Sequence, residues 1–181
     1  MKMKRIYLIG FMGSGKSTIG ALLATTLGLP LIDTDAVIEK EERSSIPRIF
    51  TERGERYFRS RERRILRRLT RNYRVSGFVM ATGGGMPASA RNIGYMRRHG
   101  TVVYIEAAVS TLVARIRNSA SRPVYSRLGS GCRDDKEEAV RNLLEIRAPF
   151  YRRAHITVQS TNDTNADETS RRITQSLKEQ G

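Results

Sequence analysis

One segment, residues 10–17, fits the pattern G-x-x-x-x-G-K-[ST] in full, with the sequence Gly10-Phe11-Met12-Gly13-Ser14-Gly15-Lys16-Ser17. The apolar run 6–9 precedes it and predicts a buried strand of a parallel sheet. Apolar residues at helical spacing follow over 18–27, and Gly28 ends that helix. Because a strand and a helix flank the segment, a phosphate-binding loop is favoured over a chance glycine turn.

The spacing within this loop explains its chemistry. Glycines let the backbone curl so that consecutive N–H groups point at phosphate oxygens, and the helix N-terminus adds partial positive charge. Lys16 can reach the β- and γ-phosphates, and the Ser17 hydroxyl can coordinate Mg²⁺. We therefore predict a site for a nucleoside triphosphate, with ATP as the first candidate, formed by Gly13, Ser14, Gly15, Lys16, Ser17 and Thr18.

The rest of the chain alternates strand and helix patterns. Further strands are expected at 29–32, 77–81, 101–105 and 156–159. Further helices are expected at 36–43, 46–71 with a break near Gly54, 88–98, 109–117, 136–148 closed by Pro149, and 168–177. The polar stretch 118–135 predicts a long mobile loop, which is often a functional lid. This alternation predicts an α/β fold with a parallel sheet and helices on both faces.

Composition limits the class of protein. The 181 residues suit one domain, and 39% hydrophobic with 28% charged residues is an ordinary globular composition. One cysteine, Cys132, excludes a disulfide framework and gets no catalytic role. The apolar runs are too short for a signal peptide or a membrane span, so we expect a soluble cytoplasmic protein.

The charge is unusual and unevenly placed. The net charge is +15, and ten arginines against two glutamates, Glu55 and Glu62, lie within 53–74. Such an excess suggests anionic ligands, nucleic acid or an anionic surface, without choosing among them.

Signatures of other nucleotide-binding classes are missing. The sequence has no N-K-x-D or D-x-x-G, which argues against a GTPase, and no L-S-G-G-Q, which argues against a transporter ATPase. The strand 77–81 ends in Thr82-Gly83 without an acidic residue. The carboxylates near the loop must then be Asp33 and Asp35, at the sheet edge where α/β proteins bind ligands. One could lie near Mg²⁺ and the other could accept a hydroxyl proton, or Asp35 could only cap the next helix.

Together with further motifs, these residues resemble the shikimate kinase family of the nucleoside monophosphate kinase-like P-loop group. The match covers about residues 4–160 and consists of GFMGSGKST at 10–18, LIDTD at 31–35, Ile49-Phe50 to Gly54-Glu55, Phe58-Arg59 with Glu62, Gly83-Gly84-Gly85, Arg122-Pro123, and Arg147 before 148–151. It departs from the family at Met86-Pro87 and at Val124-Tyr125, where the lid would pack.

The resemblance implies a three-layer P-loop kinase fold, with a central parallel sheet of about five strands flanked by helices and a mobile lid. One kinase domain would cover 1–181, with a substrate-binding helical region at 34–72 and a lid at 117–136. The implied reaction is ATP-dependent phosphorylation of the 3-hydroxyl of shikimate, giving shikimate 3-phosphate and ADP, in aromatic amino-acid biosynthesis with Mg²⁺ as cofactor.

The resemblance also implies roles for single residues. Asp35 would bond the shikimate hydroxyls and is the candidate base, while Lys16 and Arg122 would act on the transferring phosphate. Asp33 would join Ser17 at Mg²⁺ through the water shell of the ion. Arg59 and Arg147 would bind the shikimate carboxylate, and Arg115 would pack against adenine. The backbone of Gly83, Gly84 and Gly85 would form a close wall of the substrate site.

The residue types and their spacing support some of these implied roles. Arginine suits bidentate carboxylate binding, and Arg59 and Glu62 are three apart in a helix, so Glu62 could hold Arg59 in position. Most other arginines of 53–74 are best explained as a solvated basic face. Phe50 and Phe58 could line the pocket or the core, and His99 and His155 are taken as structural or surface residues.

Two alternatives stay open. A gluconate kinase-like enzyme would share the loop and the fold. A nucleic-acid-binding ATPase would use the arginines of 53–74 as its main surface, with salt-dependent binding. Our prediction is a monomer whose partners are ATP and shikimate, with no membrane and no specific nucleic-acid partner.

Overall fold

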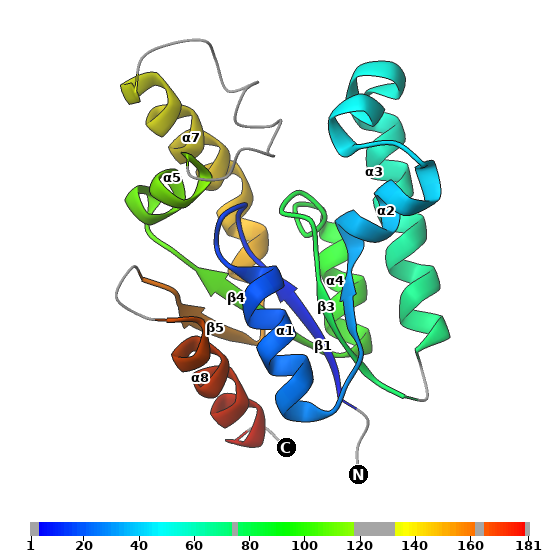
Figure 1. The fold of residues 1–181 in the computed structure, drawn as a ribbon, viewed down its shortest axis with the longest axis vertical. Coiled ribbons are helices and arrows are strands. Elements are labelled where there is room, and N and C mark those ends of the chain that lie inside the picture. The colour runs from blue at the N-terminus through cyan, green and yellow to red at the C-terminus, as the bar shows by residue number, and fades with distance from the viewer. Residues whose placement is uncertain (1–3, 74–75, 118–132, 162–164, 180–181) are drawn as a thin grey trace.

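The sheet has five parallel strands in the order β2-β3-β1-β4-β5 (Figure 1). The computed structural model describes residues 4–73, 76–117, 133–161 and 165–179, without the side chains of 117 and 133–136. The strand bounds are β1 Arg5–Ile9, β2 Leu31–Asp33, β3 Phe78–Ala81, β4 Thr101–Glu106 and β5 Ile156–Gln159. The strand order changes direction beside β1, so the loop after β1 lies at the carboxyl edge where α/β sheets bind ligands.

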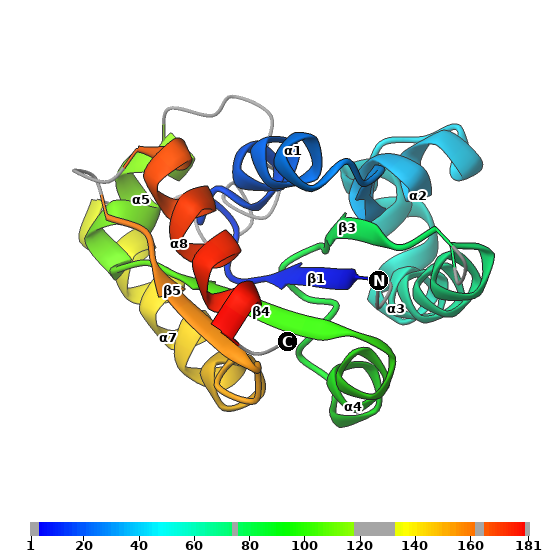
Figure 2. The same cartoon turned by 90° about the horizontal axis from the view of Figure 1, so that it is seen from below.

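Helices cover both faces of the sheet, as the alternating pattern predicted (Figure 2). On one face lie α1 (Lys16–Leu27) and α8 (Ala166–Glu179). The other face carries α3 (Ile46–Asn72), α4 (Ala90–His99), α5 (Val109–Arg117) and α7 (Arg133–Tyr151). The short helix α2 (Thr34–Glu42) follows β2 and packs on α3.

Two hydrophobic cores follow from the side-chain alternation of the strands. Tyr7 and Ile9 of β1 point into the core beneath α3, α4, α5 and α7. Ile6 and Leu8 point into the core beneath α1 and α8. Because both faces are covered, the four consecutive residues 6–9 of β1 are all buried, which explains why this run is uninterrupted by charged residues.

The start of α2 differs from the sequence prediction. The helix begins at Thr34, two residues early, because Asp33 is its N-cap and accepts hydrogen bonds from the backbone N–H groups of Asp35 and Ala36. The strand therefore ends at Asp33 and does not continue to Asp35. The cap is Asp33, and Asp35 lies in the first helical turn.

The end of α7 also differs. Pro149 was expected to close this helix, but α7 continues to Tyr151. A proline near a helix end removes only one N–H donor, and Arg152 N–H still bonds Ala148 O at 2.9 Å. At its other end, α7 begins at Arg133, within the stretch 118–135 for which a loop was predicted. Residues 118–132, with Arg122 and Cys132, lie outside the described residues.

The predicted break in α3 is confirmed. Gly54 has φ 76° and ψ 168° inside the helix, a conformation that favours glycine. No atom lies within 4 Å of where a Cβ would stand, so the backbone angle, and not space, requires the glycine. None of the helices in the described ranges has both the length and the apolar character needed to cross a lipid bilayer.

Candidate active site

The loop between β1 and α1 has the predicted geometry. Gly13 and Gly15 have φ values of 81° and 94°, in the left-handed region that side chains disfavour. Gly15 is the N-cap of α1, and Ser14 N–H bonds Phe11 O at 3.2 Å. The N–H groups at the start of α1 therefore lie in a loop that only glycines can form.

Lys16 is folded into this loop. Its Nζ donates to Phe11 O at 2.7 Å and to Ser14 Oγ at 3.4 Å, and only 9% of the residue is exposed. The ammonium group therefore adds its charge to the positive end of α1, where anionic oxygens are stabilised.

Asp33 joins the loop to α2. Ser17 Oγ donates to Asp33 Oδ2 at 2.8 Å, while Asp33 Oδ1 holds the N-terminus of α2. A hydroxyl and a carboxylate beside a phosphate loop are oxygen donors of the kind Mg²⁺ prefers, with phosphate oxygens and water as its other ligands. These two residues therefore fit the predicted metal position.

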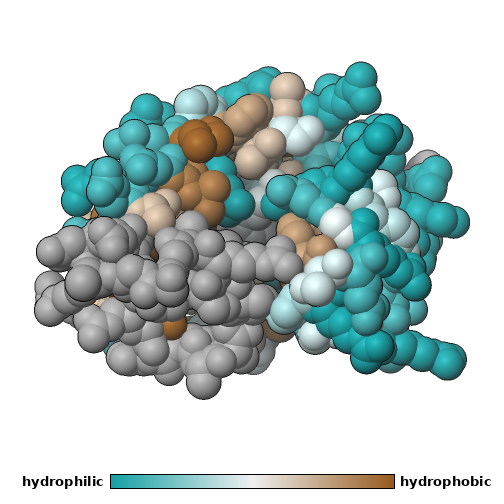
Figure 3. Space-filling view, turned by 90° about the horizontal axis from the view of Figure 1, so that it is seen from above, coloured by the Kyte–Doolittle hydropathy of each residue, from teal (hydrophilic) through white to brown (hydrophobic). Residues whose placement is uncertain are grey.

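A cavity of about 480 Å³ extends from the phosphate loop to α3. It brings together nearly all the predicted site residues that the structure describes: Gly13, Gly15, Lys16, Ser17, Thr18, Asp33, Asp35, Arg59, Gly83, Gly84, Gly85 and Arg147. Ser14 is fully buried and points its hydroxyl into the loop. Seen from above, hydrophilic residues dominate the side formed by α2 and α3 (Figure 3).

Each glycine of the triplet 83–85 faces a different predicted residue. A Cβ on Gly83 would overlap Asp35 Oδ1, and one on Gly85 would overlap Arg59 Nη1. A Cβ on Gly84 would lie 3.3 Å from the backbone nitrogen of Met12 and 3.6 Å from Arg147 Nη1. The triplet also lies in turns, since Met86 N–H bonds Gly83 O at 3.0 Å and Ala88 N–H bonds Gly85 O at 3.1 Å. None of the three has a positive φ, so these turns do not require glycine, and the close approach of Asp35 and Arg59 accounts for Gly83 and Gly85.

Arg59 is held by two carboxylates. Its Nη1 donates to Glu62 Oε2 at 2.7 Å, as the spacing predicted, and its Nη2 donates to Glu55 Oε1 at 2.9 Å. Glu62 is 1% exposed, and this burial raises its pKa to about 7, although the nearby Arg59 lowers it. The contact of Glu55 was not predicted, although its i, i+4 spacing from Arg59 was a usable signal.

Two aromatic rings also lie close to the guanidinium group of Arg59. Its guanidinium carbon lies 5.4 Å from the ring centre of Phe58 and 5.8 Å from that of Phe50. The two rings lie 4.6 Å apart, and both residues line the cavity. Phe58 is also 4% exposed and belongs to the core, so it serves both roles left open by the sequence.

Tyr151 is the residue that the sequence analysis missed. It is fully buried, and its hydroxyl donates to Gly84 O at 2.6 Å. Burial raises the pKa of Tyr151 to about 12, whereas the charge and hydrogen bond of Arg147 lower it. The hydroxyl therefore links Arg147 to the glycine wall. The i, i+4 spacing of the two residues was a signal, hidden by the expected stop at Pro149.

Arg115 does not line this cavity. Its Nη1 donates to Ser160 Oγ at 3.0 Å and its Nη2 to Thr161 O at 2.6 Å, which ties α5 to the segment after β5. Arg122 lies outside the described residues.

A phosphate loop that shares one cavity with a carboxylate and two arginines, on a five-stranded parallel sheet, defines a P-loop kinase of small molecules. The shikimate kinase family model matches residues 12–178. The chain belongs to the shikimate kinase family.

Relatives named shikimate kinase align with nearly the whole of this chain. The chain is 39% identical over 180 residues to the shikimate kinase of Dehalococcoides mccartyi, covering 99% of this chain and 97% of the relative. It is 40% identical over 176 residues to that of Halorhodospira halophila, covering 97% and 94%. The solved shikimate kinase from Acinetobacter baumannii in complex with shikimate superposes with a TM-score of 0.88 at 36% identity, covering 99% and 95%. These relatives favour a shikimate kinase over a gluconate kinase-like enzyme.

Proposed function

We propose that this enzyme transfers the γ-phosphate of ATP to the 3-hydroxyl of shikimate, giving shikimate 3-phosphate and ADP, a step of aromatic amino-acid biosynthesis. One observation carries the proposal. A single cavity joins the phosphate loop to Asp35, Arg59 and Arg147, and each of these side chains lies against one glycine of 83–85. Membership of the shikimate kinase family and the relative solved with shikimate support the choice of acceptor.

The two arginines suit the carboxylate of the acceptor. A guanidinium presents a planar fork that matches the two oxygens of a carboxylate. Glu62 and Glu55 fix the orientation of Arg59, and Tyr151 fixes that of Arg147. An acceptor with one carboxylate would therefore meet donors that are already oriented, which lowers the entropy lost on binding.

Asp35 suits the hydroxyl side of the acceptor. Its Oδ1 lies against Gly83, whose N–H bonds Thr34 Oγ1 at 3.0 Å, so the start of α2 and the glycine wall hold each other. A carboxylate here can accept a hydrogen bond from the attacking hydroxyl and orient its oxygen toward the γ-phosphate. Because the transition state of phosphoryl transfer is loose, this orientation matters at least as much as removal of the proton.

Three residues, Lys16, Ser17 and Asp33, would bind the phosphates of ATP and Mg²⁺. Lys16 would stabilise the charge on the β- and γ-phosphate oxygens, and Ser17 with Asp33 would hold Mg²⁺. A bound Mg²⁺ ion neutralises negative charge on the transferring phosphate. The proposal has four further parts. Arg115 would pack against adenine, and Arg122 would contact the phosphate from a lid at 117–136. The region 34–72 would bind the acceptor, and the enzyme would act as a cytoplasmic monomer.

The first test is ADP release from Mg·ATP with and without shikimate, with quinate and gluconate as controls. We expect shikimate alone to stimulate turnover strongly. Turnover on gluconate without any response to shikimate would contradict the proposed acceptor, and the phosphate-loop assignment would stand.

A matched pair of variants tests the acceptor contact. Arg147→Ala should raise the KM for shikimate by at least about tenfold and that for ATP far less, because one charged donor to the carboxylate is lost. Arg152→Ala, an exposed arginine one residue beyond the end of α7, should change neither constant. Equal effects of both variants on both constants would contradict the assigned contact.

A further inference from the structure

The arginines of α3 differ in what they touch. Arg53, Arg61 and Arg68 form ion pairs with carboxylates of α2, for example Arg61 with Glu41 at 2.9 Å. Arg59 is held inside the cavity by Glu55 and Glu62. These four therefore have structural or site roles, and the dense positive charge of 53–74 is only partly neutralised by them.

A second set of arginines forms no such ion pair among the residues that the structure describes. We define the arginine face as the exposed residues of α3 and α4 that lie on the outer side of these two neighbouring helices: Arg63, Arg64, Arg67, Arg71, Arg91 and Arg98. Within the part of the chain that the structure describes, no carboxylate forms an ion pair with any of the six. The helix α4 contains no acidic residue at all.

The face is regular and includes aromatic rings. Arg63, Arg67 and Arg71 recur every four residues, which places them about 6 Å apart along the helix axis. The guanidinium carbon of Arg67 lies 5.9 Å from the ring centre of Tyr95 on α4. Tyr95 in turn stacks on His99 with ring centres 4.0 Å apart, and both are partly exposed. The two helices thus present guanidinium groups around one stacked pair of rings.

We infer that the arginine face binds the phosphate backbone of nucleic acid without reading the base sequence. Arginine forks match phosphate oxygens, and like charges four apart on a helix repel each other until anions bind between them. The Tyr95–His99 pair can pack against a base of a single strand, since base stacking on aromatic side chains is tolerant of sequence. This binding is compatible with the expectation of no specific nucleic-acid partner, and it uses no residue of the proposed active site.

The composition of the face disfavours other anionic partners. Membrane-surface helices insert large apolar side chains between their basic residues. The large exposed hydrophobic residues of the described chain are Leu31 on β2 and Ile146 on α7, neither of which lies on α3 or α4. Protein interfaces have cores depleted of charge, whereas this face consists mostly of charged groups.

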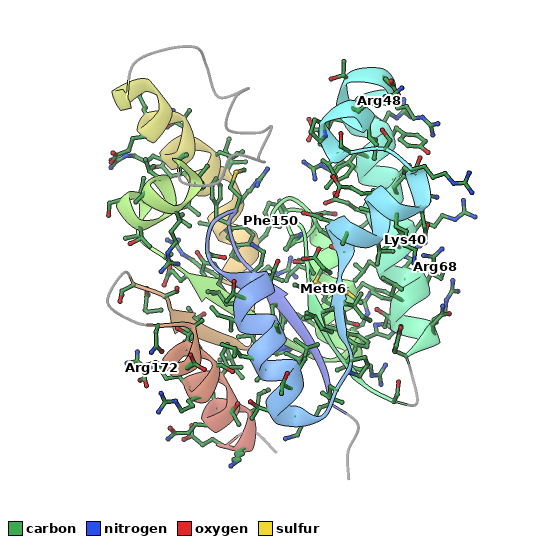
Figure 4. The ribbon with its side chains drawn as sticks, in the orientation of Figure 1. Lys40, Arg48, Arg68, Met96, Phe150 and Arg172 are labelled. Carbon is green, nitrogen blue, oxygen red and sulfur yellow. The ribbon has the colours of Figure 1, made fainter. Side chains whose placement is uncertain are left out.

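The test is fluorescence anisotropy of a labelled single-stranded DNA of mixed sequence, titrated with the full-length enzyme at several salt concentrations. The test variant combines Arg64→Glu, Arg67→Glu and Arg71→Glu. The matched control combines Arg171→Glu, Arg172→Glu and Lys178→Glu on α8, which changes the net charge equally. Figure 4 shows Arg172 on α8 on the opposite side of the molecule from Arg68 of α3.

For the test variant we expect affinity to fall at least about tenfold at about 0.1 M salt, and the slope of log K against log salt to become shallower by about 2. The control should change affinity less than about twofold, and both variants should keep shikimate-dependent turnover. If the reversed charges unfold the test variant, the same three positions changed to alanine should still weaken binding.

Three results would overturn the inference: no binding by the unmodified enzyme at low salt, equal losses in both triple variants, or binding to phosphatidylserine vesicles but not to DNA. Since kinase turnover is measured separately, failure of this inference leaves the proposed function untouched.

Discussion

Single hydroxyl groups and carboxylates decide how the guanidinium groups of this site are oriented. Arg147 is linked through Tyr151 to Gly84, and Arg59 is linked to Glu62 and Glu55. In both cases a residue one helical turn away fixes a donor that would otherwise rotate. We therefore expect Tyr151 and Glu62 to act as positioning residues, whose loss should change acceptor binding more than folding.

Replacing Tyr151 by phenylalanine removes only the hydroxyl. We expect the KM for shikimate to rise about three- to tenfold with little change in the KM for ATP, because Arg147 loses its link to the glycine wall. The control is Tyr7→Phe, which removes another buried hydroxyl, bonded to Thr70 Oγ1 at 2.9 Å, and neither of these two residues lines the cavity. Steady-state kinetics and thermal unfolding separate the two. The same shift in KM for both variants would contradict a positioning role.

Glu62 should make stability depend on pH. Burial raises its pKa to about 7, so between its ordinary value of 4.5 and about 7 the folded protein binds a proton that the unfolded chain releases. Its contribution to stability is thus present at low pH and is lost as the pH rises through this window. Relative to Glu62→Gln, the free energy of unfolding of the unmodified protein should fall by about 1 to 3 kcal/mol from about pH 5 to pH 8. Parallel urea curves for the two proteins would contradict this.

At the scale of helices, α2 and α3 act as one unit because ion pairs join them. Glu42 is the centre of these contacts, since its Oε2 accepts hydrogen bonds from Arg53 at 3.1 Å and from Tyr57 Oη at 2.8 Å. Its other oxygen pairs with Arg61 at 2.5 Å. The side chain of Glu42 is 8% exposed and that of Arg61 17%, so water cannot replace these contacts fully.

Glu42→Ala should therefore lower the free energy of unfolding by about 1 to 3 kcal/mol, because the partly buried Arg61 and Tyr57 lose their acidic partner. The control is Glu52→Ala, which breaks the exposed pair with Arg48, where the side chains are 49% and 69% exposed. That change should stay within about 0.5 kcal/mol. Chemical unfolding of both variants measures the difference, and similar losses would mean that the contacts of Glu42 are no stronger than surface ion pairs.

How far the sequence predicts these elements depends on whether local signals agree with tertiary contacts. The strand, loop and helix around Lys16 were predicted correctly, because glycine spacing and apolar runs are local. The end of α7 was wrong, since proline is a local stop signal whereas the packing of Tyr151 is tertiary. The contact of Tyr151 with Gly84 spans 67 positions, which no spacing rule can reveal.

At the scale of the molecule, the sheet divides the interior into two cores, and only one of them adjoins the cavity. Ile49 lies in the core under α3, next to Phe50 of the cavity wall, and Ile173 lies in the core under α8. Both are almost fully buried. The two positions can therefore separate general stability from support of the site.

Ile49→Ala and Ile173→Ala should each destabilise the protein by about 2 to 5 kcal/mol, since each leaves a cavity of similar size. Only Ile49→Ala should also raise the KM for shikimate, because the start of α3 loses its support beneath Phe50. The measurement is steady-state kinetics well below the unfolding temperature of the weaker variant. A raised KM in Ile173→Ala would show that the two cores are not independent.

The glycine triplet has a consequence for anyone who wishes to redesign this enzyme for another acceptor. A single added carbon would overlap Asp35 at Gly83 and Arg59 at Gly85, and at Gly84 it would meet the backbone of Met12 first. Random libraries that include codons 83–85 would spend most of their diversity on inactive clones. Ile46 and Pro47, which line the same cavity with apolar side chains, are better positions at which to change its volume.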